Sequence, residues 1–359
     1  SSPVLIAPSS VYPRANALFN LSSPHPDTPL IITSYTTLSG PNKILSLSIS
    51  TDHAQSWTFL SHIWQANAST HDIDNPFPLQ LPNGDILYAF RNHDIDPVTS
   101  GEYTYYRITI CISKDYGQTW EFLSHASERK ANREKGKNNG LWEPFLRVDG
   151  KGRLQVYYSG EKEGDGKRQD NVMRVSDDLG RTWNEERVVS RGRDGKEARD
   201  GMMGVAEAGD GEEGHLVCIF ETTEDDGVFS VDTVESFDDG ESWGEGTRKR
   251  VYTAADGRDA GAPQVWNVGG VLVGSFMTNE GSGTEQIDGG EMKIILSRDG
   301  GKTWSNFGKD GESTATGQRA TVAAEKGSHW PGLFKLDDKR FLALYSADGM
   351  GAVSRVFEI

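Results

Sequence analysis

Two glutamates in this sequence stand where a pair of carboxyl groups can do acid–base chemistry. Glu143 directly precedes Pro144 in the segment LWEPF, where other copies of the same repeat have Asn75, Ala262 or Trp330. Glu221 directly follows the apolar run LVCIF. Hydrolysis of a glycosidic bond needs one carboxylic acid that protonates the leaving oxygen and one carboxylate that acts as nucleophile or base. We therefore predict that Glu143 and Glu221 form a catalytic pair.

The surroundings of these glutamates favour different protonation states. Burial beside Trp142 raises the pKa of one carboxyl group, and a nearby arginine keeps the other ionised. The alternative for each glutamate is a structural ion pair with an arginine, because perturbed carboxylates in clefts also occur in such pairs. Glu207 competes with Glu221, although the aligned repeats put it opposite Arg147, deeper along its strand. Glu161 ends a strand too, but its charged, Gly-rich surroundings indicate a solvated loop.

Further residues are predicted to bind the substrate. They precede the first apolar strand of a repeat or follow the second, and they combine aromatic rings with hydrogen-bonding groups, as a sugar requires. They are Arg14, Asn75, Arg91, His93, Asp94, Trp142, Arg199, Asp200, Trp330 and Tyr345. The sequence has neither a C-x-x-C nor an H-E-x-x-H motif, so we expect no metal and no cofactor. We expect Cys111 and Cys218 to be buried as small hydrophobes, with a disulfide left open.

The elements that position these residues follow from an internal repeat. The pattern S-x-D-x-G-x-[ST]-W, known as the Asp box, occurs at 113–120, 176–183, 236–243 and 297–304, and 50–57 matches it with Ala54 in place of Gly. The copies start 63, 63, 60 and 61 residues apart. We interpret each copy as a hairpin turn: its Asp accepts backbone N–H groups, its Gly supplies a positive φ, and its Trp packs between neighbouring units.

A second repeat lies between the Asp boxes and consists of a strand, a polar turn and an apolar strand. It occurs at 12–40, 75–94, 141–162, 201–224, 261–280 and 329–349. Six copies with four strands each predict an all-β fold, a six-bladed β-propeller that occupies residues 1–359 as one domain. The last copy has no Asp box, so we expect residues 3–8 to supply its fourth strand and to close the ring.

This arrangement separates the two faces of the ring. The Asp boxes share one face with the turns between the first and second strands. The starts of the first strands and the ends of the second strands lie on the other face, around the central channel. The predicted site therefore lies opposite the Asp boxes.

Composition limits the partners. Lys and Arg number 37 against 53 Asp and Glu, which gives a net charge of −16. Such a surface repels nucleic acid and anionic membranes, so a neutral ligand is favoured. The start at Ser1 and the sequons at Asn20 and Asn67 suggest a processed, secreted protein. We expect a monomer.

The segments NGLWEPFLRVDG, RDGMMGVA, HLVCIFE, SFDDGESW and GAPQVW carry a family resemblance. Together with the Asp boxes of the sialidase-like superfamily, they resemble fungal exo-1,5-α-L-arabinanases of glycoside hydrolase family 93. The resemblance implies a retaining enzyme that releases arabinobiose from the non-reducing end of α-1,5-arabinan. It also implies that Glu143 is the acid/base and Glu221 the nucleophile. The turn 208–215 is longer and more charged than the family pattern, which keeps Glu207 open as the second carboxylate.

Two other functions stay open at this point. A sialidase-like exo-glycosidase of other specificity would need three arginines that clamp a carboxylate and a Tyr nucleophile assisted by a Glu. The segment Tyr12-Pro13-Arg14 is only loosely similar to the arginine motif of such enzymes. A non-catalytic carbohydrate-binding propeller would use the same fold to present loops.

Overall fold

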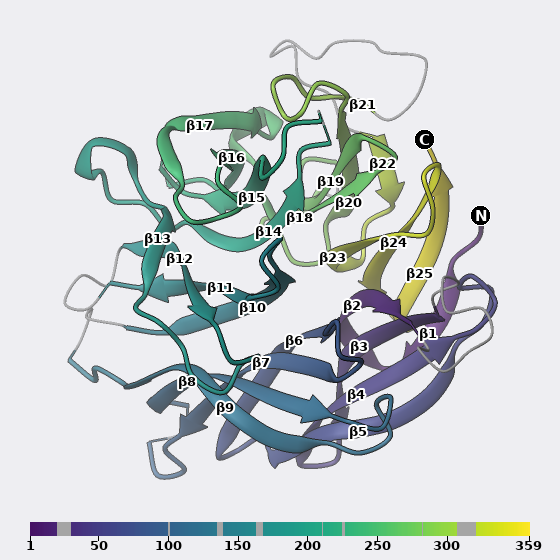
Figure 1. Ribbon diagram of the computed structural model, residues 1–359, viewed down its shortest axis with the longest axis vertical. Coiled ribbons are helices and arrows are strands. Elements are labelled where there is room, and N and C mark those ends of the chain that lie inside the picture. Colours follow the sequence, from purple (N-terminus) through teal and green to yellow (C-terminus); the bar gives the residue numbers. More distant parts are fainter. Residues whose placement is uncertain are drawn as a thin grey trace.

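The computed structural model describes residues 1–19, 30–99, 101–134, 139–162, 168–209, 211–224, 227–281, 283–306 and 321–359. Its strands form six antiparallel sheets, which are the six predicted blades. Figure 1 shows them around a common axis, with the first strand of each blade innermost. The prediction of an all-β, six-bladed propeller is confirmed.

The strands follow one plan in every blade, from the axis outward. Blades I to III contain β2 (Ser10–Leu18), β3 (Leu30–Ser39), β4 (Asn42–Ser50), β5 (Thr58–Asn67); β6 (His71–Gln80), β7 (Ile86–Ile95), β8 (Tyr103–Ser113), β9 (Glu121–Lys130); and β10 (Leu141–Val148), β11 (Leu154–Glu161), β12 (Gln169–Ser176), β13 (Arg187–Ser190). Blades IV to VI contain β14 (Gly201–Glu207), β15 (Leu216–Thr222), β16 (Ser230–Ser236), β17 (Gly244–Tyr252); β18 (Ala260–Val268), β19 (Val271–Thr278), β20 (Glu291–Ser297), β21 (Ser305–Asn306), β22 (Thr321–Ala324); and β23 (Ser328–Lys335), β24 (Arg340–Ala347), β25 (Gly351–Glu358), β1 (Val4–Pro8). The short 3₁₀ helices η1 (Arg193–Gly195) and η2 (Ala255–Gly257) precede β14 and β18.

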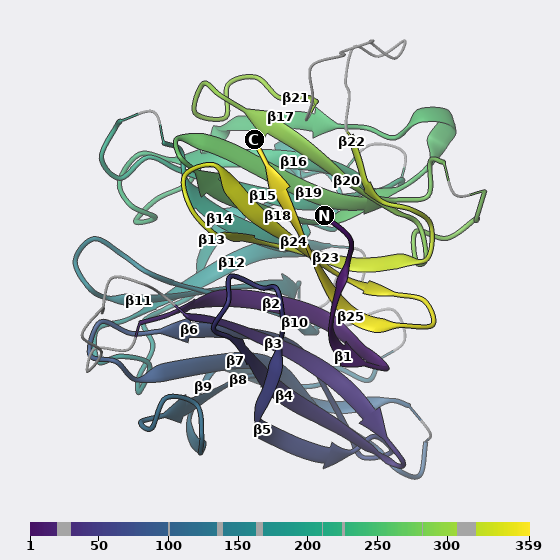
Figure 2. The same cartoon turned by 90° about the vertical axis from the view of Figure 1, so that its right-hand side faces the viewer.

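The ring closes as predicted. Strand β1 pairs antiparallel with β25, so the N-terminus supplies the outer strand of blade VI. Both ends of the chain therefore lie on the same side of the molecule, as Figure 2 shows. This pairing covers the backbone groups of β25 that would otherwise form an open sheet edge.

The Asp boxes are hairpin turns with one recurrent hydrogen-bond pattern. In the second box, Ser113 Oγ donates to Asp115 at 2.8 Å, and the Gly117 amide donates to Ser113 Oγ at 2.8 Å. The box tryptophan reaches the preceding blade, where Trp120 Nε1 donates to Ser61 at 3.0 Å. Ala54 holds the glycine position of the first box at a φ of 64°, so the turn keeps its shape and the strain falls on Ala54.

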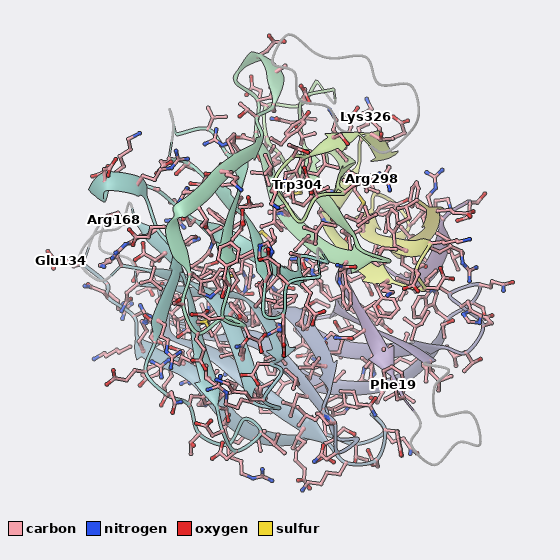
Figure 3. All side chains as sticks on the ribbon, turned by 45° about the horizontal axis from the view of Figure 1, so that its top comes forward. Phe19, Glu134, Arg168, Arg298, Trp304 and Lys326 are labelled. Atoms are coloured by element: carbon pink, nitrogen blue, oxygen red, sulfur yellow. The ribbon has the colours of Figure 1, made fainter. Side chains whose placement is uncertain are left out.

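The core lies between the blades. Figure 3 shows side chains crowded into the space between the ribbons. Cys111 and Cys218 are buried and unbonded, which confirms their prediction as small hydrophobes. No helix in the described ranges is long and apolar enough to cross a membrane.

Candidate active site

A β-bulge recurs near the start of the innermost strand of every blade. Each bulge has one residue at positive φ, and the register of the strand shifts there. These residues form what we call the bulge ring: Tyr12, Asn75, Glu143, Met202, Ala262 and Trp330, at φ between 43° and 58°. Positive φ is costly for residues other than glycine, and such strain gathers at functional sites. Five of the six residues precede a proline, which is the sequence signal of the bulge.

A second ring lies on the adjacent strands. The residue just before each bulge pairs with one residue of the second strand of its blade. These partners form what we call the partner ring: Thr36, Arg91, Ser159, Glu221, Met277 and Ser346. Glu143 and Glu221 thus belong to two neighbouring rings at the same end of the channel, in adjacent blades. The blade alignment made from the sequence placed both correctly.

The position of Glu221 has a structural use in other blades. Ser346 accepts the backbone N–H of Tyr12 in the next blade at 3.0 Å, and Ser159 likewise accepts that of Met202 at 3.3 Å. Glu221 makes the same bond, because the N–H of Ala262 donates to its Oε2 at 2.6 Å. Blade IV therefore replaces a serine with a carboxylate. Since Oε2 is engaged, Oε1 is the oxygen left for chemistry.

Two glycines make room for the Glu221 carboxylate. A methyl group on Gly261 of blade V would lie 2.5 Å from Oε2 of Glu221, and one on Gly201 would lie 3.2 Å from Oε1. A carbon atom cannot approach an oxygen as closely as 2.5 Å. The two positions without a side chain therefore define where this carboxylate sits.

Both carboxyl groups have raised pKa values. Burial raises the pKa of Glu143 to about 8, with Glu221 adding to the effect while Arg91 and Arg199 oppose it. Burial also raises the pKa of Glu221 to about 7, against the Ala262 N–H and Arg199. Both side chains remain partly exposed at the channel end. Each carboxyl group can therefore gain or lose a proton near neutral pH, as general acid–base chemistry requires.

Arg199 interacts electrostatically with both glutamates and is held by Glu161. Its Nη2 donates to Glu161 Oε1 at 3.1 Å, and Glu161 also accepts the N–H of Gly140 at 2.8 Å. The prediction that Glu161 lies in a solvated loop is wrong, because its side chain is only 4% exposed. Glu161 instead ties Arg199 to the segment that leads into Glu143.

Four of the residues predicted in blades I to III, Arg14, Asn75, Arg91 and Trp142, lie on the Glu143 side of the site. The guanidinium of Arg14 lies 3.9 Å from the ring centre of Tyr12, and that of Arg91 lies 5.3 Å from Trp142. Buried side-chain atoms without a hydrogen-bond partner gather here: Arg14 Nη2, Asn75 Oδ1, Arg91 Nε and Trp142 Nε1. An unpaired buried polar atom costs about 1–3 kcal/mol, so such a cluster favours a hydroxyl-rich ligand that supplies the missing partners.

The remaining wall of the site is apolar. Tyr12, Met202, Ala262 and Met277 form one buried cluster, against which Trp330 packs. Trp330 was predicted, whereas Ala262 and Met277 were not assigned to the site. The blade alignment could have identified both residues, because Ala262 belongs to the bulge ring and Met277 belongs to the partner ring. An apolar wall opposite polar groups suits the two kinds of surface on a sugar ring.

Two predicted binding residues are buried in the blades instead. Asp200 is fully buried and accepts two hydrogen bonds from Arg248, at 2.8 and 3.1 Å. Tyr345 is 4% exposed and packs in the core between blades V and VI. Its neighbour Ser346 belongs to the partner ring, so the prediction was wrong by one residue. Because successive strand residues point to opposite faces, that single step turns the Tyr345 side chain away from the site. Neither prediction holds in this structure.

His93 and Asp94 also lie outside the site. His93 is fully buried, and its Nε2 donates to the Leu141 carbonyl at 2.7 Å, while burial lowers its pKa to about 3. It therefore positions the start of β10, two residues before Glu143, rather than a substrate. Asp94 accepts two bonds from Arg107, at 2.8 and 2.9 Å, and lines a different groove. Both corrections follow from contacts that no local pattern reveals.

Glu207 is far from Glu143. It ends β14 and pairs with Leu216, whereas Gly201 at the start of β14 pairs with Glu221. Leu216 and Glu221 are five positions apart in β15, or about 16 Å at ~3.3 Å per residue. Glu207 lines an apolar cavity of about 590 Å³ at the other end of the channel. Glu207 is the one carboxylate in the lining of that cavity, so it has no acidic partner there among the described residues.

Arg248 on β17 fixes the strand ends that present Glu221. All five of its N–H groups have acceptors: two bonds go to Asp200, one to Asp232 at 2.8 Å, one to Thr222 at 3.0 Å, and one to a backbone carbonyl. Thr222 directly follows Glu221 in β15. Arg248 therefore joins the first and second strands of blade IV behind the site.

Replacing Arg248 by Met is expected to destabilise the protein by about 3–5 kcal/mol, because the buried Asp200 loses its counter-charge and Asp232 loses one of its arginine partners. Thermal denaturation measures this as a fall in Tm. Arg340→Met is the matched control: Arg340 pairs with Asp337 at the surface, where such pairs contribute at most about 1 kcal/mol. Equal Tm values for the two variants would contradict the structural role of Arg248.

The fold and the site define an Asp-box propeller with a carboxylate pair and arginines at one end of its axis. The chain belongs to the BNR repeat-like domain family, whose model matches residues 41–304. No curated protein matches it by sequence. Among the described residues, no cluster of three or more His, Cys, Asp or Glu is placed to hold a metal ion.

Solved structures resemble the whole chain. An α-L-arabinanase from Penicillium chrysogenum in complex with arabinobiose is 17% identical, with a TM-score of 0.70 over 100% of this chain and 98% of that one. A GH93 α-L-arabinofuranosidase of Fusarium graminearum with arabinobiose is 18% identical, with a TM-score of 0.67 over 100% and 98%. The NanB sialidase from Streptococcus pneumoniae is 10% identical, with a TM-score of 0.62 over 100% and 70%. At these identities the likeness is one of fold.

Proposed function

We propose that this protein is a secreted, exo-acting glycoside hydrolase that releases arabinobiose from the non-reducing end of α-1,5-linked L-arabinan. The observation that carries the proposal is the pair Glu143 and Glu221, with pKa values raised to about 8 and about 7 at one end of the channel. The arabinobiose complexes of two proteins with the same fold support the choice of sugar.

In the proposed mechanism the two carboxyl groups have separate roles. Glu143, with the higher pKa, protonates the leaving glycosidic oxygen. Glu221 attacks the anomeric carbon through Oε1, while the Ala262 N–H holds its other oxygen. Water then hydrolyses the glycosyl-enzyme as Glu143 takes back a proton, so the anomeric configuration is retained. The nearby Arg199 favours the ionised form of the nucleophile.

Product analysis on linear α-1,5-arabinan tests the proposal. We expect arabinobiose as the sole early product, with ¹H NMR showing the retained anomer immediately after cleavage. Release of single arabinose units would overturn the disaccharide product, a ladder of oligosaccharides would overturn exo action, and the inverted anomer would overturn the retaining mechanism.

We also propose that the protein is a monomer, which sedimentation tests. Export of the protein from the cells that make it tests the proposed secretion. The sequon at the exposed Asn67 supports secretion, and Asn20, in the other sequon, lies outside the described residues.

A sialidase-type activity is the second candidate, because one observation favours it. Arg14, Arg91 and Arg199 all lie near Glu143, and Tyr12 is close enough to interact with it. Burial raises the pKa of Tyr12 to about 12, however, which disfavours a phenolate nucleophile. The net charge of −16 also repels a sialylated substrate. Turnover of a fluorogenic sialoside without turnover of arabinan would establish this candidate.

The pH dependence of kcat/KM is expected to be bell-shaped, with its optimum between about pH 7 and pH 8. Activity rises as Glu221 loses its proton near pH 7, because only the carboxylate is a nucleophile. Activity falls as Glu143 loses its proton near pH 8, because the ionised carboxylate can no longer protonate the leaving oxygen. Initial rates from pH 5 to pH 10 measure both limbs. An optimum near pH 4, where ordinary carboxyl groups titrate, would contradict these assignments.

A further inference from the structure

A groove between blades I and II is separate from the channel site. Its volume is about 360 Å³, and its lining includes Trp64, Asn92, Asp94, Arg107, Phe122 and His125. The two blades lie side by side in Figures 1 and 2. Strand β7 separates the groove from the channel, because Arg91 lies on the side of Glu143 and its neighbour Asn92 lines the groove.

A repeated sequence motif supplies part of this groove. The segments WTFLSH (57–62) and WEFLSH (120–125) follow the first two Asp boxes. Their tryptophans and serines stabilise the contacts between blades, as described above for Trp120 and Ser61. The phenylalanine and histidine have no such role, and Phe122 is 52% exposed. A register shift at Leu123 puts Phe122 and His125 on one face of β9, with ring centres 4.9 Å apart.

A chain of hydrogen bonds gives the groove a defined donor and a defined acceptor. Asn92 Nδ2 donates to Thr109 Oγ1 at 3.2 Å, and Thr109 Oγ1 lies 3.1 Å from Nδ1 of His125. Burial lowers the pKa of His125, so the ring is neutral. We assign the Thr109 hydroxyl as the donor to Nδ1 of His125, the arrangement that leaves Nε2–H of His125 as a donor to a ligand.

Asn92 lacks a partner for its other atom. Asn92 is 7% exposed, and its Oδ1 is buried without a hydrogen-bond partner. A ligand hydroxyl can accept from His125 and donate to Asn92. Asp94 and Arg107 pair through two hydrogen bonds, and each has a further partner of opposite sign, His71 in the lining and Glu128 beside it, so neither charge is left uncompensated. Trp64 and Phe122 supply aromatic surface on which the apolar face of a sugar ring packs.

We propose that this groove is a second carbohydrate-binding site, which holds a neutral polysaccharide chain apart from the carboxylate pair. This second-site proposal rests on the proposed function only for the identity of the sugar. A chain held in the groove raises the local concentration of chain ends at the channel. The groove therefore increases retention on polymer and needs no reaction of its own.

Native gels with embedded polysaccharide test the proposal directly. All proteins carry Glu221→Gln so that the polymer stays intact, and the gels contain linear α-1,5-arabinan, xylan, a β-glucan or polygalacturonate. We expect at least one neutral polymer to retard the parent. We expect Phe122→Ala and His125→Ala each to weaken that retardation about three- to tenfold, the worth of an aromatic or hydrogen-bond contact. Phe59→Ala, the equivalent position in blade I, is the control and is expected to match the parent.

The outcomes separate the groove from the catalytic proposal. The proposed binding site would be overturned if Phe122→Ala and His125→Ala left the retardation unchanged. It would also be overturned if Phe59→Ala lowered the retardation as much as they do. Preference for the anionic polygalacturonate, or retardation by no neutral polymer, would overturn it too. If arabinan is not hydrolysed, but xylan or β-glucan retards the protein through Phe122, the groove stands and the proposed activity falls.

Discussion

Replacing Glu143 or Glu221 by Gln is expected to lower kcat/KM on linear α-1,5-arabinan by about 10³-fold or more. Each substitution keeps the size of the side chain and removes its proton transfer or its nucleophilic oxygen. Steady-state kinetics on arabinan measure the loss. Circular dichroism and Tm are expected to match the parent, and binding of arabinobiose, measured by calorimetry, is expected to survive.

A matched substitution at Glu207 separates the two candidates for the second carboxylate. Glu207→Gln is expected to keep full activity, because Glu207 lies at the opposite end of the channel. The roles are separated by azide, which supplies an external nucleophile. We expect azide to restore turnover by Glu221→Ala with inversion of the product, but to leave its configuration retained with Glu143→Ala. Full activity of Glu221→Gln would end the assignment of the pair.

Gly261→Ala is expected to lower kcat by about 100-fold, although Gly261 carries no functional group. Its new methyl group would lie 2.5 Å from Oε2 of Glu221 and must push the carboxylate aside. A displacement of about 1 Å at a reacting group costs about 10²-fold in rate. The end of the Glu221 side chain can move, so the protein is expected to stay folded, with a Tm near that of the parent.

The control for this substitution is Gly246→Ala. Gly246 has no atom within 4 Å of an added methyl group and lies in the outer strand of blade IV. We expect its kinetics to match the parent. If Gly261→Ala also matched the parent, the Glu221 carboxylate would not occupy the position described here, or would not take part in the reaction.

The sequence predicted the parts of the molecule that repeat. The spacing of the Asp boxes set the register of the blades, and that register placed Glu143 and Glu221 on adjacent blades at one end of the channel. The ring closure by residues 3–8 followed from counting strands. These features were predictable because each blade makes the same contacts, so one copy of the pattern explains the next.

The misplaced residues depend on contacts between distant segments. Asp200 is buried by Arg248, 48 positions away, and His93 is held by the carbonyl of Leu141 in the next blade. Tyr345 was misplaced because strand alternation turns a shift of one residue into a change of face. The bulges add a further shift that the hydrophobic pattern alone does not show. Such pairings leave no periodic trace in the sequence.

The ring closure also bears on how the chain reaches its native state. Val4 pairs with Ser354, so the outer strand of blade VI joins the two ends of the polypeptide. During synthesis β1 stays without its partner strand until β25 has been made. Contacts between residues so far apart in sequence form slowly, because the entropy of closing the loop is lost first. Loss of either β1 or β25 would open the ring and expose a sheet edge, so the closure of the whole propeller depends on this one pair of strands.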